Sequence, residues 1–437
     1  MKFYSTNNQS PAVDFKEATI NGQAPDKGLY FPTSIPVFEK NFIKNIDKLS
    51  NEEIAFGVIA PYVGDTIPPD KLKQIVAETV NFPIPLIQIT DSIYSLELFH
   101  GPTLAFKDIG ARFMSRCLGY FVDKGQTVTV LVATSGDTGG AVANGFYGVE
   151  GVEVVILYPS GKVSPVQEKQ LTTPGKNIHA LEVEGSFDDC QQMVKQAFAD
   201  EQIRKKRFLT SANSINVARW LPQQFYYLFA YRQWPDKENP PVISVPSGNF
   251  GNICAGLLAH RSGLPVAHFI AACNANDVVP KFMQTKKFEP KPALSTLSNA
   301  MDVGNPSNFV RILELFQHEI PGLEKVFSSI SITDKETTAA IAEVFRQYQY
   351  TLDPHGAVGY LALKSWLEKY PGQKGIFLET AHPIKFPEAV EKYTGSSLTM
   401  PASMQGIINK KKVSTLMKPD YSALKDFLMS RPEIIVQ

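Results

Sequence analysis

Short apolar runs alternate with amphipathic stretches along most of this chain. The runs are rich in β-branched residues, and each is bounded by turn-forming residues, which predicts strands. They cover residues 127–133, 152–159, 179–184, 242–245, 266–273 and 375–380. Between them, apolar residues recur at helical spacing, as in the stretch that follows Ser186. Strands that alternate with helices in this way predict a parallel α/β architecture.

Helix starts are visible at several of these junctions. Ser164, Pro165 and Gln167 fit an N-cap, a first-turn proline and a capping-box partner. Ser186 is a second predicted N-cap, and Cys190, Met193, Val194, Ala197 and Phe198 behind it form the predicted core face of a helix. A further helix is predicted from Ala141, after a glycine-rich loop.

Residues 1–95 differ from the rest of the chain. They are rich in proline and turn residues, with helical patterns near 51–59 and 70–80. We therefore expect an N-terminal cap domain over residues 1–95 and a catalytic region over 96–437. The catalytic region is long enough for two α/β units, of which the smaller is expected at roughly 110–210.

Composition narrows the function classes. The 437 residues include 43 Lys plus Arg and 43 Asp plus Glu, so there is no basic excess for binding nucleic acid. No apolar run is long enough to span a bilayer. The cysteines lie far apart, without the spacing of a metal site, which predicts reduced thiols in a cytoplasmic protein that binds no metal. They are Cys117, Cys190, Cys254 and Cys273.

One lysine stands out for its surroundings. Lys107 lies in HGPTLAFKDIGARF (100–113), among small and apolar residues. Poor hydration disfavours the charged ammonium, so we expect a lowered pKa and an amine able to form a Schiff base. Its neighbour Asp108 is expected to be structural. A solvated surface lysine at the start of an amphipathic helix is the competing interpretation.

Two glycine-rich loops follow predicted strands. They are ATSGDTGGAV (133–142) and PSGNFGNICAG (246–256). At a junction between a strand and a helix, backbone N–H groups can hold an anion. Neither loop carries the lysine of a P-loop or a convincing dinucleotide fingerprint. Glycines that only close tight turns are the competing interpretation. Together with Lys107, the two loops favour two anionic sites.

Four motifs in this order resemble those of the threonine synthases. They are HGPTLAFKD, TSGDTGG, SGNFGN and ETAHPIKFPEAV, and the segment 3–36 resembles the N-terminal domain of that family. The family consists of pyridoxal-phosphate enzymes with the tryptophan-synthase-β-like fold (fold type II). The resemblance covers nearly the whole chain. It implies two doubly wound α/β domains with the cofactor between them, plus the N-terminal cap domain.

The resemblance also implies roles for individual residues. Lys107 would bind the cofactor covalently and act as the catalytic base, and the Thr380 hydroxyl would contact the pyridine nitrogen. The cofactor phosphate would be held by Gly248, Asn249, Phe250, Gly251 and Asn252. The substrate would be bound by Ser135, Asp137 and Thr138 of TSGDTGG and by Ser214, Asn216 and Arg219 of NSINVAR (213–219). A carboxylate at position 137 is unexpected beside an anionic substrate, and Arg219 could instead cap or pair on a helix.

The implied reaction converts O-phospho-L-homoserine and water into L-threonine and phosphate, by elimination and replacement at Cβ and Cγ, as the last step of threonine biosynthesis. We see no additional regulatory domain, which favours a monomer.

The alternatives are a related phospholyase, a serine/threonine dehydratase, a nicotinamide-dependent oxidoreductase and an inactive binding protein. Dehydratases need no second anion site, and Tyr158-Pro159-Ser160 lacks the acid that a dinucleotide site would place there. His100, His355 and His382 are expected to be hydrogen-bonded structural residues.

Overall fold

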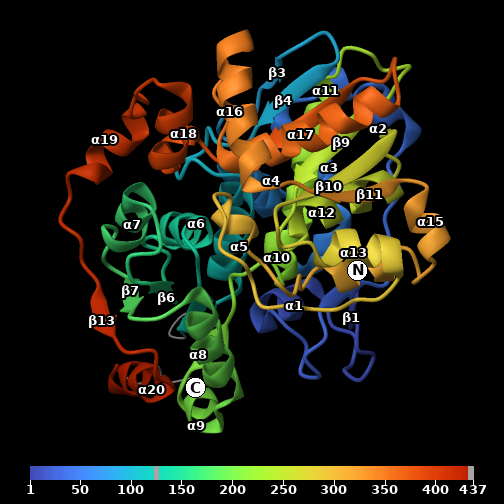
Figure 1. Cartoon of the computed structure of the whole chain (residues 1–437). Coiled ribbons are helices and arrows are strands. Elements are labelled where there is room, and N and C mark those ends of the chain that lie inside the picture. Colours follow the sequence, from blue (N-terminus) through green and yellow to red (C-terminus); the bar gives the residue numbers. More distant parts are fainter. Residues whose placement is uncertain (123–126, 432–437) are drawn as a thin grey trace.

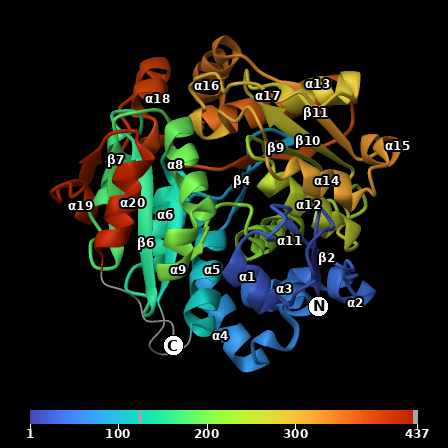
Figure 2. The same cartoon turned by 90° about the horizontal axis from the view of Figure 1, so that it is seen from below.

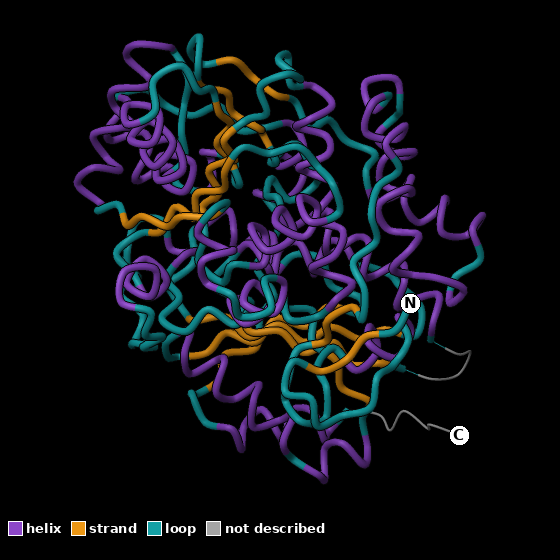
Figure 3. The backbone as a smooth tube through the Cα atoms, turned by 90° about the vertical axis from the view of Figure 1, so that its right-hand side faces the viewer, coloured by secondary structure: helices purple, strands orange, loops and turns teal. Residues whose placement is uncertain are grey.

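The computed structural model describes residues 1–122 and 127–431 of the chain. Two mainly parallel sheets form separate layers with helices between them (Figure 1, Figure 3). The larger sheet has the strand order β11 (Phe327–Ser331), β10 (His268–Cys273), β9 (Val242–Pro246), β12 (Gly375–Glu379), β4 (Ile93–Glu97) and β3 (Leu86–Gln88). Only β3, at its edge, runs antiparallel to its neighbour.

The smaller sheet is parallel throughout. Its order is β13 (Thr415–Met417), β7 (Ile178–Val183), β6 (Val152–Pro159), β5 (Val128–Ala133) and β8 (Phe208–Thr210). Its strands alternate with α6 (Asp137–Phe146), α7 (Pro165–Thr172), α8 (Phe187–Ala199) and α9 (Glu201–Lys206). The predicted capping boxes at Ser164 and Ser186 are both present. The α/β architecture predicted from the sequence is therefore confirmed.

The start of α6 corrects a prediction. The helix begins at Asp137, not at Ala141, and includes Gly139 and Gly140 in its first turn. A Cβ on Gly139 would lie 2.4 Å from Leu171 Cδ2 of α7. These glycines therefore allow close packing between helices, whereas the sequence pattern indicated a longer turn.

The N-terminal region packs on the helices that surround the large sheet. Strands β1 (Phe3–Ser5) and β2 (Tyr30–Pro32) pair antiparallel, and α1 (Phe15–Asn21) lies between them in the chain. After β2 follow α2 (Lys40–Lys44), α3 (Asn51–Val63) and α4 (Pro69–Thr79), of which α3 and α4 lie near the predicted positions 51–59 and 70–80. In Figure 2, α1 and α4 lie beside α5 (Lys107–Phe121). The boundary near residue 95 remains a prediction; β3 lies before it and β4 spans it, and both strands belong to the large sheet.

The C-terminal stretch (red in Figure 1) runs along the outside of the small sheet. It leaves the large sheet after β12, passes through α18 (Pro387–Thr394) and α19 (Ala402–Ile408), and adds β13 and α20 (Tyr421–Ser430) to the smaller unit. The remaining helices are α10 (Val217–Trp220), α11 (Gln224–Gln233), α12 (Gly251–Arg261), α13 (Val278–Thr285), α14 (Phe309–Leu315), α15 (Ile320–Glu324), α16 (Asp334–Tyr348) and α17 (Pro354–Lys369).

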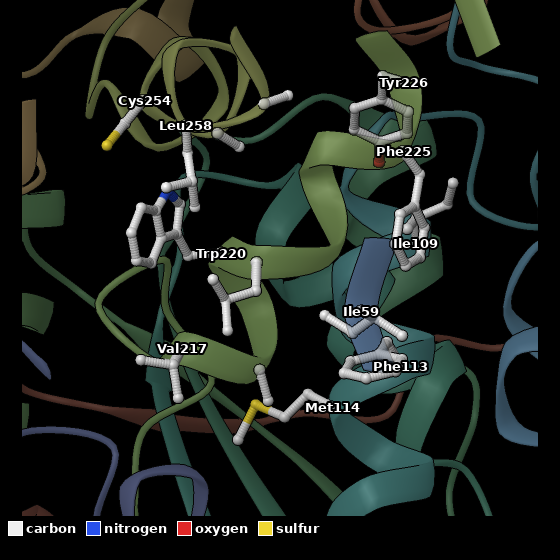
Figure 4. Packing of buried hydrophobic residues seen from close by; sticks show 14 of the residues in the cluster. Ile59, Ile109, Phe113, Met114, Val217, Trp220, Phe225, Tyr226, Cys254 and Leu258 are labelled. Atoms are coloured by element: carbon white, nitrogen blue, oxygen red, sulfur yellow. The ribbon is translucent and has the colours of Figure 1, made fainter. Parts of the chain in front are cut away.

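Apolar packing fixes the helix that carries Lys107. Figure 4 shows Ile109, Phe113 and Met114 of α5 facing side chains of α10 and α11. All three α5 residues are fully buried. Because this face of α5 is enclosed, the first turn of the helix has a defined position relative to both sheets.

The state of the cysteines and the apolar character of the helices can be compared with the sequence analysis. All four cysteines are buried and unpaired, which agrees with the expected reduced thiols. Within residues 1–122 and 127–431, no helix combines the length and apolar character that crossing a membrane would require.

Candidate active site

Lys107 and Thr380 are neighbours in space although they lie far apart in the sequence. Lys107 is the first residue of α5. Just before it, the Phe106 N–H donates to the Thr380 carbonyl oxygen over 2.9 Å, and Ala105 forms an antiparallel bridge with Ala381. The segment that leaves β12 therefore runs alongside the start of α5. This pairing brings together the predicted lysine and the predicted partner of the pyridine nitrogen.

The surroundings of Lys107 favour an uncharged amine. Its side chain is only partly exposed, and burial lowers its pKa to about 8. The nearby Asp137 carboxylate raises this pKa, whereas the positive charges of Lys385 and Arg219 lower it. Near neutral pH a larger share of Lys107 is therefore unprotonated than of an ordinary lysine. The lowered pKa agrees with the sequence-based prediction.

The loop after β9, residues 248–252, has the features of an anion-binding site and is called the cradle below. Within the described residues, none of the backbone N–H groups from Gly248 to Asn252 donates a hydrogen bond to the protein. The loop opens α12, and Phe250 before it is left-handed, with φ 60°. The buried amide nitrogen of Asn252 also lacks a partner. Unsatisfied donors at a helix N-terminus suit a phosphate group.

A second loop supports this cradle from behind. A Cβ on Gly248 would lie 2.6 Å from the Cα of Met301, so the two backbones are in close contact. The preceding Ala300 N–H donates to His355 Nε2 over 3.2 Å. His355 is buried, and its Nδ1 lies 2.6 Å from Asp353 Oδ1. His355 therefore holds the loop that packs against the cradle.

The segment 213–219 also adjoins the cradle. Ser214 Oγ accepts hydrogen bonds from Asn249 Nδ2 (3.1 Å) and Asn308 Nδ2 (2.9 Å). Asn216 caps α10 through the Ala218 N–H. Its amide nitrogen donates to two backbone carbonyl oxygens. The Asn216 side chain thus holds the segment in place, and its predicted contact with substrate remains a prediction.

Arg219 brings a buried positive charge close to Lys107. Its guanidinium donates to the Ala212 carbonyl oxygen over 2.7 Å, and its Nε has no partner among the described residues. Burial lowers its pKa to about 10, while Tyr226 and Asp108 raise that pKa. No carboxylate in the described part of the chain forms an ion pair with it. An anionic ligand could therefore use this charge.

Three hydroxyl groups of the predicted site are available to a ligand. Ser135, Thr138 and Thr380 make no side-chain hydrogen bond within the described residues. Ser135 and Thr138 are partly exposed, and Thr380 is 6% exposed. Ser135 and Thr138 flank the start of α6, on the small-sheet side of Lys107.

Asp137 has a counter-ion that the sequence analysis did not identify. Its Oδ1 accepts from Gln167 Nε2 over 2.9 Å and lies 2.7 Å from Lys385 Nζ. Burial alone would raise the pKa of Asp137, but the charges of Lys385 and Lys107 hold it well below its usual value. The carboxylate is therefore ionised and neutralised by Lys385. This pairing explains how an acid can lie beside an anionic substrate.

Sequence reasoning missed two supporting residues, Lys385 and Arg311. Arg311 is fully buried and donates to the carbonyl oxygens of Tyr30, Ser214 and Ile215. Lys385 lies inside the quoted motif ETAHPIKFPEAV, which was the only available indication of it. Arg311 has no local pattern at all. Its partners come from distant segments of the chain.

The other two histidines have protein partners as expected. His100 Nε2 lies 2.7 Å from Glu97 Oε2. His382 Nδ1 accepts from the Ile384 N–H and caps the short 3₁₀ turn Pro383–Lys385. Burial lowers the pKa of His382 to about 4.

Comparison with protein-family models covers almost the whole chain. Residues 2–80 match the model described as threonine synthase N terminus. Residues 82–377 match that of pyridoxal-phosphate dependent enzymes, and residues 356–428 match threonine synthase, C-terminal.

Individual relatives agree with these models. The chain is 43% identical to the threonine synthase of Serratia marcescens, over 99% of this chain and 100% of that protein. The crystal structure of threonine synthase from Escherichia coli has a TM-score of 0.92 at 43% identity and covers 98% of this chain and 99% of that one. The pyridoxal-phosphate-bound threonine synthase from Brucella melitensis also has a TM-score of 0.92, at 35% identity and 98% coverage of both chains. The chain belongs to the threonine synthase family of pyridoxal-phosphate-dependent enzymes.

Proposed function

We propose that the site around Lys107 converts O-phospho-L-homoserine and water into L-threonine and phosphate. One observation carries this proposal. Lys107, whose pKa is lowered, lies close to Thr380 and to a second buried cation, Arg219. The cradle at 248–252 accounts for one phosphate, and Arg219 offers a place for a second anionic group. We also infer that the chain acts as a monomer, because one chain supplies every residue of the proposed site.

The residues present fit pyridoxal phosphate. We assign its phosphate to the N–H groups of Gly248–Asn252, its covalent attachment to Lys107 Nζ and its ring nitrogen to the Thr380 hydroxyl. When bound, the cofactor withdraws electrons from the substrate carbons and makes their protons acidic. The unpartnered donors of the cradle and the free hydroxyl of Thr380 support this assignment.

Lys107 then serves as the proton carrier. With cofactor and substrate bound, Lys107 Nζ would be the group that removes the proton from substrate Cα. A pKa of about 8 lets the same amine accept a proton and release it again near neutral pH. Loss of a Cβ proton accompanies departure of the γ-phosphate, a proton returns to Cγ, and water adds at Cβ. In the net reaction one water molecule is added to the substrate and one phosphate is released.

We assign substrate recognition to groups on both sides of Lys107. The hydroxyls of Ser135 and Thr138 face the substrate from the small-sheet side, and Arg219 contributes the positive charge for an anionic group. Ser214 and Asn216 hold the segment that carries Arg219. Asp137 contributes no net negative charge, because Lys385 neutralises it.

The reaction can be tested directly with purified protein and pyridoxal phosphate. O-phospho-L-homoserine should yield L-threonine and inorganic phosphate in equal amounts. L-homoserine, which lacks the phosphate, serves as the matched control and should yield neither product. Release of 2-oxobutyrate as the main product would contradict the proposal and support a dehydratase-like activity.

Thr380 offers a test of the ring-nitrogen assignment. Thr380→Asp replaces a neutral hydroxyl by a carboxylate, which would hold a proton on the ring nitrogen and strengthen electron withdrawal. We expect threonine formation to fall at least about tenfold, equivalent to ~1.4 kcal/mol. Thr380→Ser keeps the hydroxyl and should retain most of the activity. Turnover of the Asp variant at the wild-type rate would show that Thr380 does not contact the ring nitrogen.

A further inference from the structure

Lys385 is a fully enclosed cation with a defined set of partners. Its side chain is 0% exposed, and its Nζ lies 2.7 Å from Asp137 Oδ1 and 2.8 Å from the Thr103 carbonyl oxygen. A buried ammonium is costly unless it is paired and hydrogen-bonded. Both conditions are met here, so the position of Lys385 is closely tied to that of Asp137.

This ion pair joins the two α/β units. Lys385 follows β12 of the large sheet, whereas Asp137 opens α6 of the small-sheet unit. Gln167 of α7 donates to the same Asp137 oxygen over 2.9 Å. Lys385 therefore ties the start of α6, which Ser135 precedes and which includes Thr138, to the segment after β12.

Thr103 extends the network to the start of α5. Its N–H and hydroxyl both donate to the Asp108 carboxylate, which adjoins Lys107. The Asp108 carboxyl is buried, and burial raises its pKa. Lys385, Thr103 and Asp108 thus form a continuous buried chain of contacts that runs beside Lys107.

Lys107 lies within electrostatic reach of the same carboxylate. Asp137 and Lys107 influence each other's protonation, yet no ion pair joins them. If Asp137 had no other cation, its buried charge would favour pairing with Lys107. Such a pair would keep Lys107 protonated and unable to attack the cofactor.

We propose that Lys385 is a positioning residue that neutralises Asp137 and thereby prevents this carboxylate from taking Lys107 as its ion-pair partner. The inference rests on the proposed role of Lys107 as the cofactor-bearing lysine. It explains why an acid and a second lysine occur together at this site. The positive charge of Lys385 also disfavours protonation of Lys107.

Several charged groups act on this part of the molecule. Asp137 raises the pKa of Lys107, and Lys385 and Arg219 lower it, in addition to burial. Tyr226 of α11 and Asp108 raise the pKa of Arg219. His382 lies two residues after Thr380 in the sequence. Burial lowers its pKa to about 4, and the charge of Lys385 also lowers it, so His382 is uncharged near neutral pH.

The experiment measures the protonation of Lys107 in the full-length chain freed of cofactor. Formaldehyde and cyanoborohydride methylate only unprotonated amines, and peptide mass spectrometry then gives the Lys107 methylation rate between pH 6.5 and 10. For Lys385→Met we expect the midpoint to move to higher pH, with the rate at pH 7.5 falling at least about tenfold, which corresponds to one pKa unit or more. For Asp137→Asn we expect the opposite shift, to lower pH.

Paired and control variants separate this proposal from a loss of folding. Lys385→Met/Asp137→Asn removes both charges and should restore the wild-type rate to within about threefold. Lys364→Met removes a lysine that pairs with Glu343 away from the site and should leave the profile unchanged. Circular dichroism verifies folding. If Lys385→Met does not fold, the test rests on whether the pH midpoint of Lys107 methylation falls in Asp137→Asn.

Two results would overturn the proposal. One is a Lys107 midpoint that does not move in a folded single variant, and the other is a double variant that remains as impaired as Lys385→Met. Borohydride reduction of the wild-type holoenzyme identifies the cofactor-bearing lysine separately. A label on another lysine would refute the proposed role of Lys107 but would leave the measured effect of Lys385 on Lys107 intact.

Discussion

Lys107→Ala is expected to abolish threonine formation. The variant loses both the proposed covalent link to the cofactor and the proposed base, and loss of the base alone costs on the order of 10²–10⁴-fold in rate. The alanine fits the first turn of α5 without strain, so the fold should be retained. The measurement is turnover of O-phospho-L-homoserine, together with the visible absorbance of the bound cofactor.

A charge-preserving control makes this experiment specific. Lys107→Arg keeps a positive charge but cannot form a Schiff base, and we expect it to be as inactive as the alanine variant. In the wild type, borohydride should fix the cofactor on the peptide that contains Lys107. Retention of the cofactor absorbance in Lys107→Ala would refute the assignment.

Gly248→Ala should lose cofactor affinity. The new Cβ would lie 2.6 Å from the Cα of Met301, and a backbone atom cannot yield as a flexible side chain can. The cradle or the loop behind it must move, and its N–H groups then lose their alignment on the phosphate. We expect the Kd for pyridoxal phosphate to rise at least about tenfold, or ~1.4 kcal/mol, in a fluorescence or absorbance titration.

Gly406→Ala provides the matched comparison. The same methyl group is added in α19, where a Cβ would meet nothing within 4 Å. Helix propensity favours alanine there by ~0.5–1 kcal/mol, so stability should rise slightly while cofactor affinity stays unchanged. Equal cofactor affinity in both variants would argue against the cradle at 248–252.

The structure changes how the two glycine-rich loops are understood. Both begin a helix, but only the loop at 248–252 presents a continuous set of free N–H groups. In the other loop, Thr134 Oγ1 accepts from the N–H groups of Gly136 and Gly139, and Gln167 fills the space beside Gly136. That loop therefore offers hydroxyl groups to a ligand, and its charged residue is already paired.

Local patterns by themselves determined much of this protein. Alternating apolar runs predicted the parallel α/β architecture, because a strand buried on both faces must be apolar along its length. The capping boxes at Ser164 and Ser186 were predictable because their partners lie only three residues away. The apolar neighbours of Lys107 already indicated a lowered pKa. The ordered motifs indicated the family, which the comparisons then confirmed.

Only the tertiary structure decided how the charges are balanced. Lys385 meets Asp137, and Arg311 meets the carbonyl oxygens of Tyr30 and Ser214, across long stretches of chain. Such contacts depend on how the two sheets and the strand pair β1 and β2 pack, and no local spacing encodes them. The sequence could therefore identify the candidate reactive lysine and the candidate phosphate cradle, whereas Lys385, the counter-ion of Asp137, becomes visible only in the folded chain.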